Sequence, residues 1–297
     1  MGKRTGIAWT TSTFNPWVGC TEVSPGCDNC YAHALDKRHK WGGATHWGAG
    51  VPRYRTKNWT APLAWNKKAA ATGQRWTVFP SLCDPFDNEV PKDWRFELWT
   101  VIRETPSLTW LLLTKRIGNA LNMIPADWVT RYPNVWLGSS VVNQEEADRD
   151  IPKLLATPAA KRFVSYEPAL GPVDWTKIKG FPPDYFGRLS WLIIGGESSQ
   201  GGAKARPFDL AWARSTVNQC KAAGVPVFVK QIGSYTTDLD RLEAQPNLPG
   251  DTIVGEPTDA QLDRLIYLIE KGHFHHKDRA GADPAEWPAD LRVQEFP

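Results

Sequence analysis

The chain has 297 residues, of which 41% are hydrophobic and 23% are charged, and its formal net charge is +3. These proportions are ordinary for a globular protein with a large core and exclude a disordered chain. The small positive charge permits a nucleic-acid partner without indicating one. Sixteen tryptophans are unusual, because wide aromatic faces suit both a packed core and stacking on bases or sugars.

Targeting signals are missing from the sequence pattern. No run of eighteen apolar residues occurs, and Met1–Thr5 does not lead into a secretory segment, so we expect no membrane partner. Five cysteines, three of them clustered, do not fit a disulfide framework. We therefore expect a cytoplasmic protein.

The clustered cysteines carry the main chemical signal. Cys20, Cys27 and Cys30 follow the spacing C-x6-C-x2-C, and Pro25 and Gly26 provide a tight turn before the second one. Thiolates are soft ligands that suit iron–sulfur clusters or zinc. Three ligands leave one iron of a [4Fe–4S] cube open, which favours a cluster that binds a further ligand.

Other ligand sets for these cysteines remain open. A structural zinc site could use His33, His39 or Cys83 as a fourth ligand, although no second C-x2-C or H-x3-H pair accompanies the first. The thiols could also carry no metal.

Short apolar runs alternate with helix-length segments along the chain. The expected helices include 31–40 and 94–103. The expected strands are 7–9, 76–80, 108–113, 134–138, 162–165, 189–194 and 225–229. Continuously apolar strands between helices predict a parallel sheet covered by helices. We therefore predict an α/β fold, a partial (open) (β/α) TIM-type barrel with its functional groups at the carboxyl ends of the strands.

The pattern weakens after Ser234. Residues 236–256 are rich in Asp, Pro and Gly, which indicates an excursion over the surface, and a helix is expected at 258–270. We predict a barrel over residues 1–234 and a C-terminal helical or irregular appendage over 235–297, packed on the barrel.

A basic stretch interleaves cations with aromatic residues. Arg53, Arg55 and Lys57 alternate with Tyr54 and end at Trp59. Such a pattern suits contact with phosphates and bases, and is also compatible with a solvated face.

A first strand that leads into a three-cysteine loop with a following aromatic residue resembles the radical S-adenosylmethionine superfamily. The resemblance implies that Cys20, Cys27 and Cys30 hold a [4Fe–4S] cluster, that S-adenosyl-L-methionine binds its open iron, and that Tyr31 flanks the cofactor. It also implies an external electron donor of the flavodoxin or ferredoxin type. The superfamily pattern is C-x3-C-x2-C, so the first gap is longer here.

A wider likeness covers nearly the whole chain. The segments 15–32, 113–116, 136–140, 167–172 and 195–198 together resemble a phage-associated family with a three-cysteine motif. Within the superfamily this is distantly similar to spore photoproduct lyase. The likeness implies a nucleic-acid substrate, DNA rather than RNA, and repair or modification of a base.

The strand ends supply groups that suit the zwitterionic tail and ribose of this cofactor, namely a cation, hydroxyls, carboxylates and a Gly-Gly turn. The candidate cofactor-binding residues are Lys115, Ser139, Ser140, Glu167, Gly195, Gly196 and Glu197. The segment Thr114-Lys115-Arg116 could equally bind substrate phosphate, and a Gly-Gly turn can mark only a close backbone approach.

Two further strand-end residues are candidate catalytic groups. Cys83 follows the second expected strand, and its weak S–H bond could supply a hydrogen atom, although free cysteine also serves as a small packing residue. Tyr166 follows the fifth expected strand. The alternatives to a radical enzyme acting on nucleic acid are a radical enzyme acting on a peptide or small molecule, and a non-enzymatic, zinc-stabilised binding protein.

Overall fold

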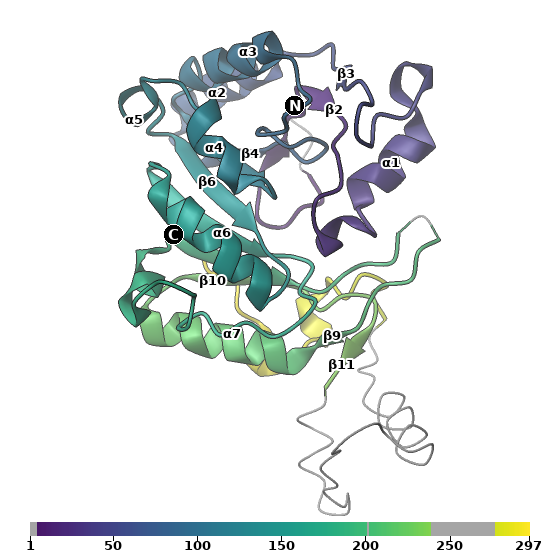
Figure 1. Ribbon diagram of the computed structural model, residues 1–297, viewed down its shortest axis with the longest axis vertical. Helices are drawn as coiled ribbons and strands as arrows, with labels where there is room; N and C mark the ends of the chain where they lie inside the picture. Colours follow the sequence, from purple (N-terminus) through teal and green to yellow (C-terminus); the bar gives the residue numbers. More distant parts are fainter. Residues whose placement is uncertain (1–4, 201, 239–276) are drawn as a thin grey trace, which may run out of the picture.

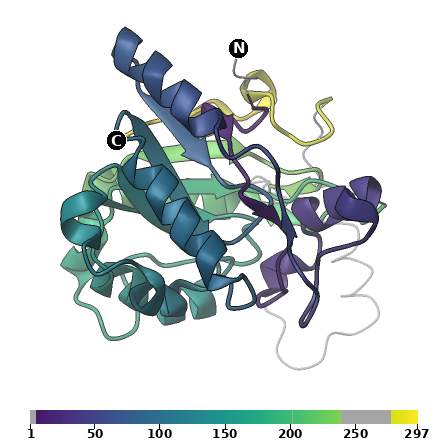
Figure 2. The same cartoon turned by 90° about the horizontal axis from the view of Figure 1, so that it is seen from above.

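The computed structural model describes residues 5–200, 202–238 and 277–297. Its centre is a seven-stranded sheet with the order β1-β4-β5-β6-β7-β8-β10, in which all neighbours pair in parallel. The sheet curls into a half-barrel that stays open between β1 and β10 (Figure 1 and Figure 2). The mixed α/β fold with a partial, open barrel is therefore confirmed. The strands are β1 (Ser12–Thr13), β4 (Trp76–Phe79), β5 (Leu108–Thr114), β6 (Val135–Ser140), β7 (Lys161–Tyr166), β8 (Trp191–Gly195) and β10 (Val227–Gln231).

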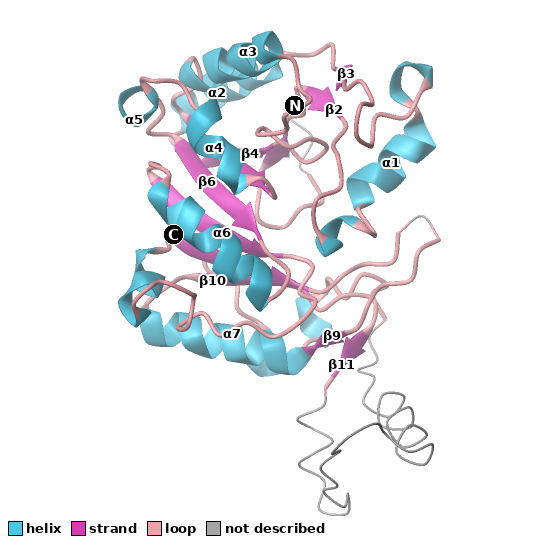
Figure 3. Cartoon of the chain, viewed as in Figure 1, coloured by secondary structure: helices cyan, strands magenta, loops and turns pink. Residues whose placement is uncertain are grey.

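Helices connect these strands and cover the outer face of the sheet (Figure 3). In the last crossover, Asp209 caps the helix by accepting from the backbone N of Ala211 at 2.9 Å, and Gly224 ends it in the left-handed region. The helices are α1 (Tyr31–His39), α2 (Ala61–Thr72), α3 (Lys92–Arg103), α4 (Ile117–Met123), α5 (Trp128–Arg131), α6 (Gln144–Ala156) and α7 (Leu210–Ala223).

Two small strand pairs stand outside the main sheet. β2 (Trp17–Val18) pairs antiparallel with β3 (Tyr54–Arg55), just before the cysteines. β9 (Phe208–Asp209) pairs parallel with β11 (Thr236–Thr237).

The first strand of the sheet does not lie at the residues predicted for it. Residues 7–9 were expected to pair, but the parallel partners of β4 are Ser12 and Thr13. Trp9 instead turns into the barrel, where its ring centroid lies 4.6 Å from that of Phe79. The apolar run fills the interior and does not extend the sheet.

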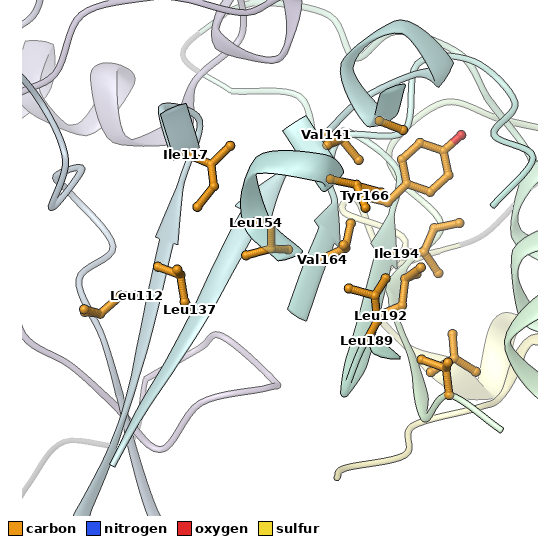
Figure 4. Close-up of a cluster of buried hydrophobic side chains, with 14 of the residues drawn as sticks. Leu112, Ile117, Leu137, Val141, Leu154, Val164, Tyr166, Leu189, Leu192 and Ile194 are labelled. Atoms are coloured by element: carbon orange, nitrogen blue, oxygen red, sulfur yellow. The ribbon is translucent and has the colours of Figure 1, made fainter. Parts of the chain in front are cut away.

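The outer core lies between the sheet and its helices. Figure 4 shows Leu112, Leu137, Val164 and Leu192 on four neighbouring strands, with Leu154 of α6 near them. All five side chains are fully buried. Successive strand residues point to opposite faces of the sheet. The residues just before and just after each of these four strand residues in the sequence therefore face the barrel interior.

The inner core is aromatic. Trp191 lies at its centre. The centroid of its ring is 6.3 Å from those of Trp9 and Trp136 and 5.9 Å from that of Phe163. Phe228 completes the set from β10 at 6.1 Å. These rings fill the concave face of the half-barrel, and the space that remains lies at the carboxyl ends of the strands.

The last described segment closes the other side of this plug. Val229 N donates to Val293 O at 2.8 Å, and the indole of Trp191 donates to Glu295 O at 2.8 Å. Arg75, just before β4, reaches Pro297 O at 2.7 Å. The segment thus runs along β10 and returns toward the opposite edge of the sheet. The helix expected at 258–270 lies outside the described residues.

Gly138 gives a test of the inner core. A Cβ atom at this position would lie 2.4 Å from Phe163 Cζ, inside the aromatic plug. We expect Gly138→Ala to lower the free energy of unfolding by about 1–3 kcal/mol, the usual cost of overpacking, in urea denaturation followed by tryptophan fluorescence.

The matched control is Gly118→Ala in α4. Its new Cβ would meet only the side chain of Lys153, at 3.6 Å, so the variant should be neutral or stabilised by up to about 1 kcal/mol. Equal stabilities for the two variants would contradict the packing described here.

Candidate functional site

A cavity of about 460 Å³ opens at the carboxyl ends of the parallel strands. This volume falls within the usual range for small-molecule sites, about 300–1,000 Å³. Its wall combines the cysteine loop, which we define as residues 20–30, with the ends of six neighbouring strands. Strand-end residues in the wall are Cys83, Lys115, Ser140, Glu167, Gly196 and Lys230.

Local hydrogen bonds shape the cysteine loop. Ser24 caps a short 3-10 turn, Pro25–Cys27, by accepting from Gly26 N at 3.0 Å. Gly26 allows close packing on the rim, since a Cβ there would lie 2.7 Å from a methyl group of Val142. Cys30 N donates to Cys27 O at 3.1 Å, and Cys30 is the residue before α1.

All three clustered cysteines line the same cavity, and Cys83 joins them. Within the described residues, no three His, Cys, Asp or Glu side chains converge closely enough to hold a metal ion. Cys20 Sγ lies 3.2 Å from Arg116 Nη1. Three thiols are soft donors of the kind that hold an iron–sulfur cluster, but in this structure their side chains do not converge on one point.

Arg116 and Asp84 form a buried ion pair beside Cys20. Arg116 Nη1 lies 3.1 Å from Asp84 Oδ2, and both side chains are 8% exposed. Asp84 also accepts from Thr114 Oγ1 at 2.7 Å and from Phe86 N at 2.9 Å. Burial and the negative charge of Asp84 raise the pKa of Cys20 to about 12, against the lowering effect of Arg116.

A second ion pair faces the cavity from β7 and β10. Lys230 Nζ lies 3.0 Å from Glu167 Oε1, without the geometry of a hydrogen bond. Glu167 Oε2 accepts from Ser165 Oγ at 3.1 Å, and Ser140 Oγ donates to the Glu167 carbonyl at 3.2 Å. Gly195 lies behind this carboxylate, since a Cβ there would be 2.8 Å from Glu167 Oε1.

Lys115 faces the same cavity from the end of β5. None of the described residues forms an ion pair with its ammonium group. Burial raises the pKa of Cys30, and the charge of Lys115 opposes this rise, so the two groups lie within electrostatic reach. Lys115 is therefore a cation available to an anionic ligand.

Tyr31 and Cys83 also lie in the cavity wall. The Tyr31 hydroxyl donates to Ser81 O at 2.6 Å, and burial raises the pKa of this phenol. Cys83 pairs through its backbone with Gly19, next to Cys20, and burial raises the pKa of its thiol well above the ordinary value.

Two predicted site residues point away from the cavity, and these predictions are wrong. Ser139 is fully buried between Leu137 and Val141, which belong to the outer core. Tyr166 is also fully buried there, and its hydroxyl donates to Gly171 O. Side chains alternate along a strand, so only one of two adjacent polar residues can face the barrel interior.

The three cations of the basic stretch differ in exposure. The Arg53 side chain is 0% exposed, with Nε 2.8 Å from Asp87 Oδ2 and Nη1 2.8 Å from Val51 O, so its assignment as a phosphate contact is wrong. Arg55 is exposed, ion-paired with Glu97 and stacked over Trp59 at 4.5 Å. Lys57 is also exposed.

Glu197 lines the cavity, but its carboxylate is already engaged. Its oxygens accept from Arg206 Nη2 at 2.6 Å and from Asn29 Nδ2 at 2.8 Å. Burial alone would raise the pKa of Glu197, but these hydrogen bonds outweigh it and lower the pKa. Sequence reasoning missed Asn29, Arg206 and Lys230. Only Asn29 and Lys230 had a signal, from their places in the C-x2-C loop and at a strand end.

Comparison with known proteins gives a family but no activity. The model of the DUF5131 family, described as a protein of unknown function, matches residues 4–270. The chain belongs to this family. No curated protein and no solved structure matches it. Among the described residues, no helix has the length and apolar character needed to cross a membrane.

The Asp84–Arg116 pair leads to a stability prediction. Asp84→Ala leaves the buried guanidinium unpaired, which should lower the free energy of unfolding by about 3–5 kcal/mol. The double variant Asp84→Ala/Arg116→Met removes both charges and should lose less. Chemical denaturation measures both variants, and a double variant that is less stable than Asp84→Ala would contradict this account of the pair.

Proposed function

We propose that this protein is a radical S-adenosylmethionine enzyme in which Cys20, Cys27 and Cys30 hold a [4Fe–4S] cluster. One observation carries the proposal: the three cysteines line a single cavity together with the polar ends of six parallel strands. Parallel barrels place their active sites at this end. The soft thiol donors suit an iron–sulfur cluster.

Cys20, Cys27 and Cys30 would hold the cluster, which would supply one electron, taken from an external flavodoxin- or ferredoxin-type donor, for the reductive cleavage of S-adenosylmethionine and hydrogen-atom abstraction from the substrate. The protein's own groups bind and orient the cofactor. Lys115 would pair with its carboxylate, and Glu167 and Ser140 would bind its amino group and ribose hydroxyls. Gly196 and Tyr31 complete the wall of the cavity.

Cys83 is the proposed hydrogen donor. Its S–H hydrogen passes to a carbon radical of the substrate, which forms a C–H bond and leaves a thiyl radical on Cys83. An electron from the same external donor and a proton from solvent return the thiol. The place of Cys83 in the wall of the cavity, together with the three clustered cysteines, supports this role.

Nucleic acid is the proposed substrate class, DNA rather than RNA. Arg55 and Lys57 are exposed at β3, which pairs with β2 just before Cys20. The guanidinium of Arg55 over Trp59 adds an aromatic face to this basic segment. A peptide or a small molecule is the alternative substrate.

Zinc binding is a second candidate function, favoured by one observation. Cys83 brings a fourth thiol to the cavity wall that holds Cys20, Cys27 and Cys30. Four thiolates suit a closed tetrahedral zinc site, which is structural and not catalytic. In that case the protein would be a zinc-stabilised binding protein.

Metal analysis of anaerobically purified protein separates these candidates. We expect about four irons and four sulfides per chain, as a [4Fe–4S] cluster requires, and no zinc. Cys20→Ala, Cys27→Ala and Cys30→Ala should each lose the iron. Stoichiometric zinc, or iron retained after all three substitutions, would contradict the proposal.

Cys220→Ala and Cys83→Ala are the matched controls. Cys220 is fully buried in α7, outside the cavity, so its variant should keep both iron and cofactor cleavage. Cys83→Ala should also keep iron and 5′-deoxyadenosine formation, but should release different substrate products. Loss of iron from Cys83→Ala would instead make Cys83 a fourth ligand of the iron site and would contradict its role as hydrogen donor.

The substrate class is tested by the salt dependence of binding. Each lost phosphate contact should reduce the slope of log K against log salt by about 0.9 on duplex DNA, so Arg55→Ala/Lys57→Ala should reduce it by nearly 2. Lys177→Ala, a change at a side chain that is 79% exposed, is the control and should not alter the slope. Absence of DNA binding in dilute buffer would favour the peptide or small molecule.

A further inference from the structure

The Gly195-Gly196-Glu197 turn after β8 contacts the cysteine loop through Arg206. The Arg206 backbone N donates to Glu197 Oε2 at 2.9 Å, its Nε donates to the same oxygen at 3.1 Å, and Nη2 donates to Oε1 at 2.6 Å. The Glu197 carboxylate therefore accepts hydrogen bonds from both the backbone and the side chain of Arg206. Its side chain is 6% exposed, which strengthens this pair relative to one in water.

The remaining donor of Arg206 points at the cysteine loop. Nη1 donates to Pro25 O at 2.8 Å and to Asp28 Oδ2 at 3.0 Å. Pro25 and Asp28 flank Cys27 on either side. A guanidinium presents its donors as a planar fork, so Arg206 can hold a carboxylate with one edge and the loop with the other.

Asn29 makes a second connection between the same two segments. Its Nδ2 donates to Glu197 Oε2 at 2.8 Å and to Lys204 O at 3.2 Å. Glu197 thus accepts hydrogen bonds from the cysteine loop directly as well as through Arg206. The loop contributes three contact points, at residues 25, 28 and 29.

The turn that carries Glu197 is itself fixed by the chain after β10. A Cβ on Gly196 would lie 2.6 Å from Ile232 O, so glycine is needed for this close backbone approach. Ser234 N donates to Glu197 O at 2.8 Å. The anchor for the cysteine loop is therefore a rigid part of the barrel.

We propose that Glu197 and Arg206 form a clamp that holds the cysteine loop against the carboxyl end of β8, and that they act as positioning residues. Every oxygen of the Glu197 carboxylate is occupied by this clamp. The Glu197 carboxylate thereby orders the loop and is engaged by protein donors instead of by a cofactor. The clamp goes beyond the proposed function, because it sets the position of Cys27 and Cys30 whatever ligand the thiols take.

Thiol alkylation of the reduced, metal-free, full-length protein tests the clamp. Each cysteine is followed separately by mass spectrometry after timed exposure to iodoacetamide. Cys27 is 8% exposed, so its alkylation reports local opening of the loop. In Arg206→Ala we expect its rate to rise at least about tenfold, the factor for about 1.4 kcal/mol, near the lower limit for hydrogen bonds to charged groups.

Two variants serve as controls for Arg206→Ala. Arg214→Ala removes an arginine of α7 that pairs with Asp238 and Asp290, away from the cysteine loop, and should leave the Cys27 rate unchanged. Arg206→Lys keeps a single charge near Glu197 but cannot hold both partners, so its Cys27 rate should lie between those of the wild type and Arg206→Ala.

Cys220, fully buried in α7, reports global unfolding. An unchanged Cys27 rate in Arg206→Ala, with Cys220 still protected, would overturn the clamp. If Cys220 also reacts, the double variant Asp28→Ala/Asn29→Ala decides, because it removes loop-side contacts and leaves the Glu197–Arg206 pair intact. Faster alkylation of Cys27 in that variant supports the clamp, and an unchanged rate overturns it. Because no metal is present, this result is independent of the proposed radical chemistry.

Discussion

The structure depends on which side chains fill the concave face of an open, curled sheet. A closed barrel fills its interior with side chains from all of its strands, whereas this seven-stranded half-barrel has a free edge at β1 and at β10. Trp191 and the surrounding rings fill the space, and the segment through Glu295 covers the β10 edge. Because the aromatic plug occupies the middle of the barrel, the cavity is left at the carboxyl ends, where the cysteine loop meets the sheet.

The sheet could be predicted because its strands are buried on both faces. Such strands are continuously apolar, so the runs that form β5 and β8 are visible without any knowledge of their partners. Because both faces are apolar, the sequence does not show which residues of a strand face the helices and which face the barrel interior. In β6, polarity could not tell Ser139, which faces the helices, from Ser140, which faces the cavity. An alternating strand would have shown its inner face directly.

Charged pairs were the part of the site that sequence could not predict. Arg53 and Arg55 have similar neighbours in the sequence. In the structure, Arg53 forms a buried ion pair with Asp87, whereas Arg55 forms an exposed one with Glu97. Arg206 had no local pattern, since Glu197 lies across a loop nine residues away and its other partners lie in the distant cysteine loop. Ionic contacts between distant segments leave no periodicity, and burial of a charge depends on finding such a partner.

The charge arrangement around the cysteines indicates which ligand the cavity suits. Three cations near it are paired: Arg116 with Asp84, Lys230 with Glu167, and Arg206 with both Glu197 and Asp28. Lys115 is left over among the described residues, next to the thiols of the loop. Its charge lowers the pKa of Cys30, but burial outweighs this effect and raises the pKa of both Cys20 and Cys30. Thiolate ligation at this site therefore has to overcome the burial of the thiols, and the charge of a bound metal would be what deprotonates them.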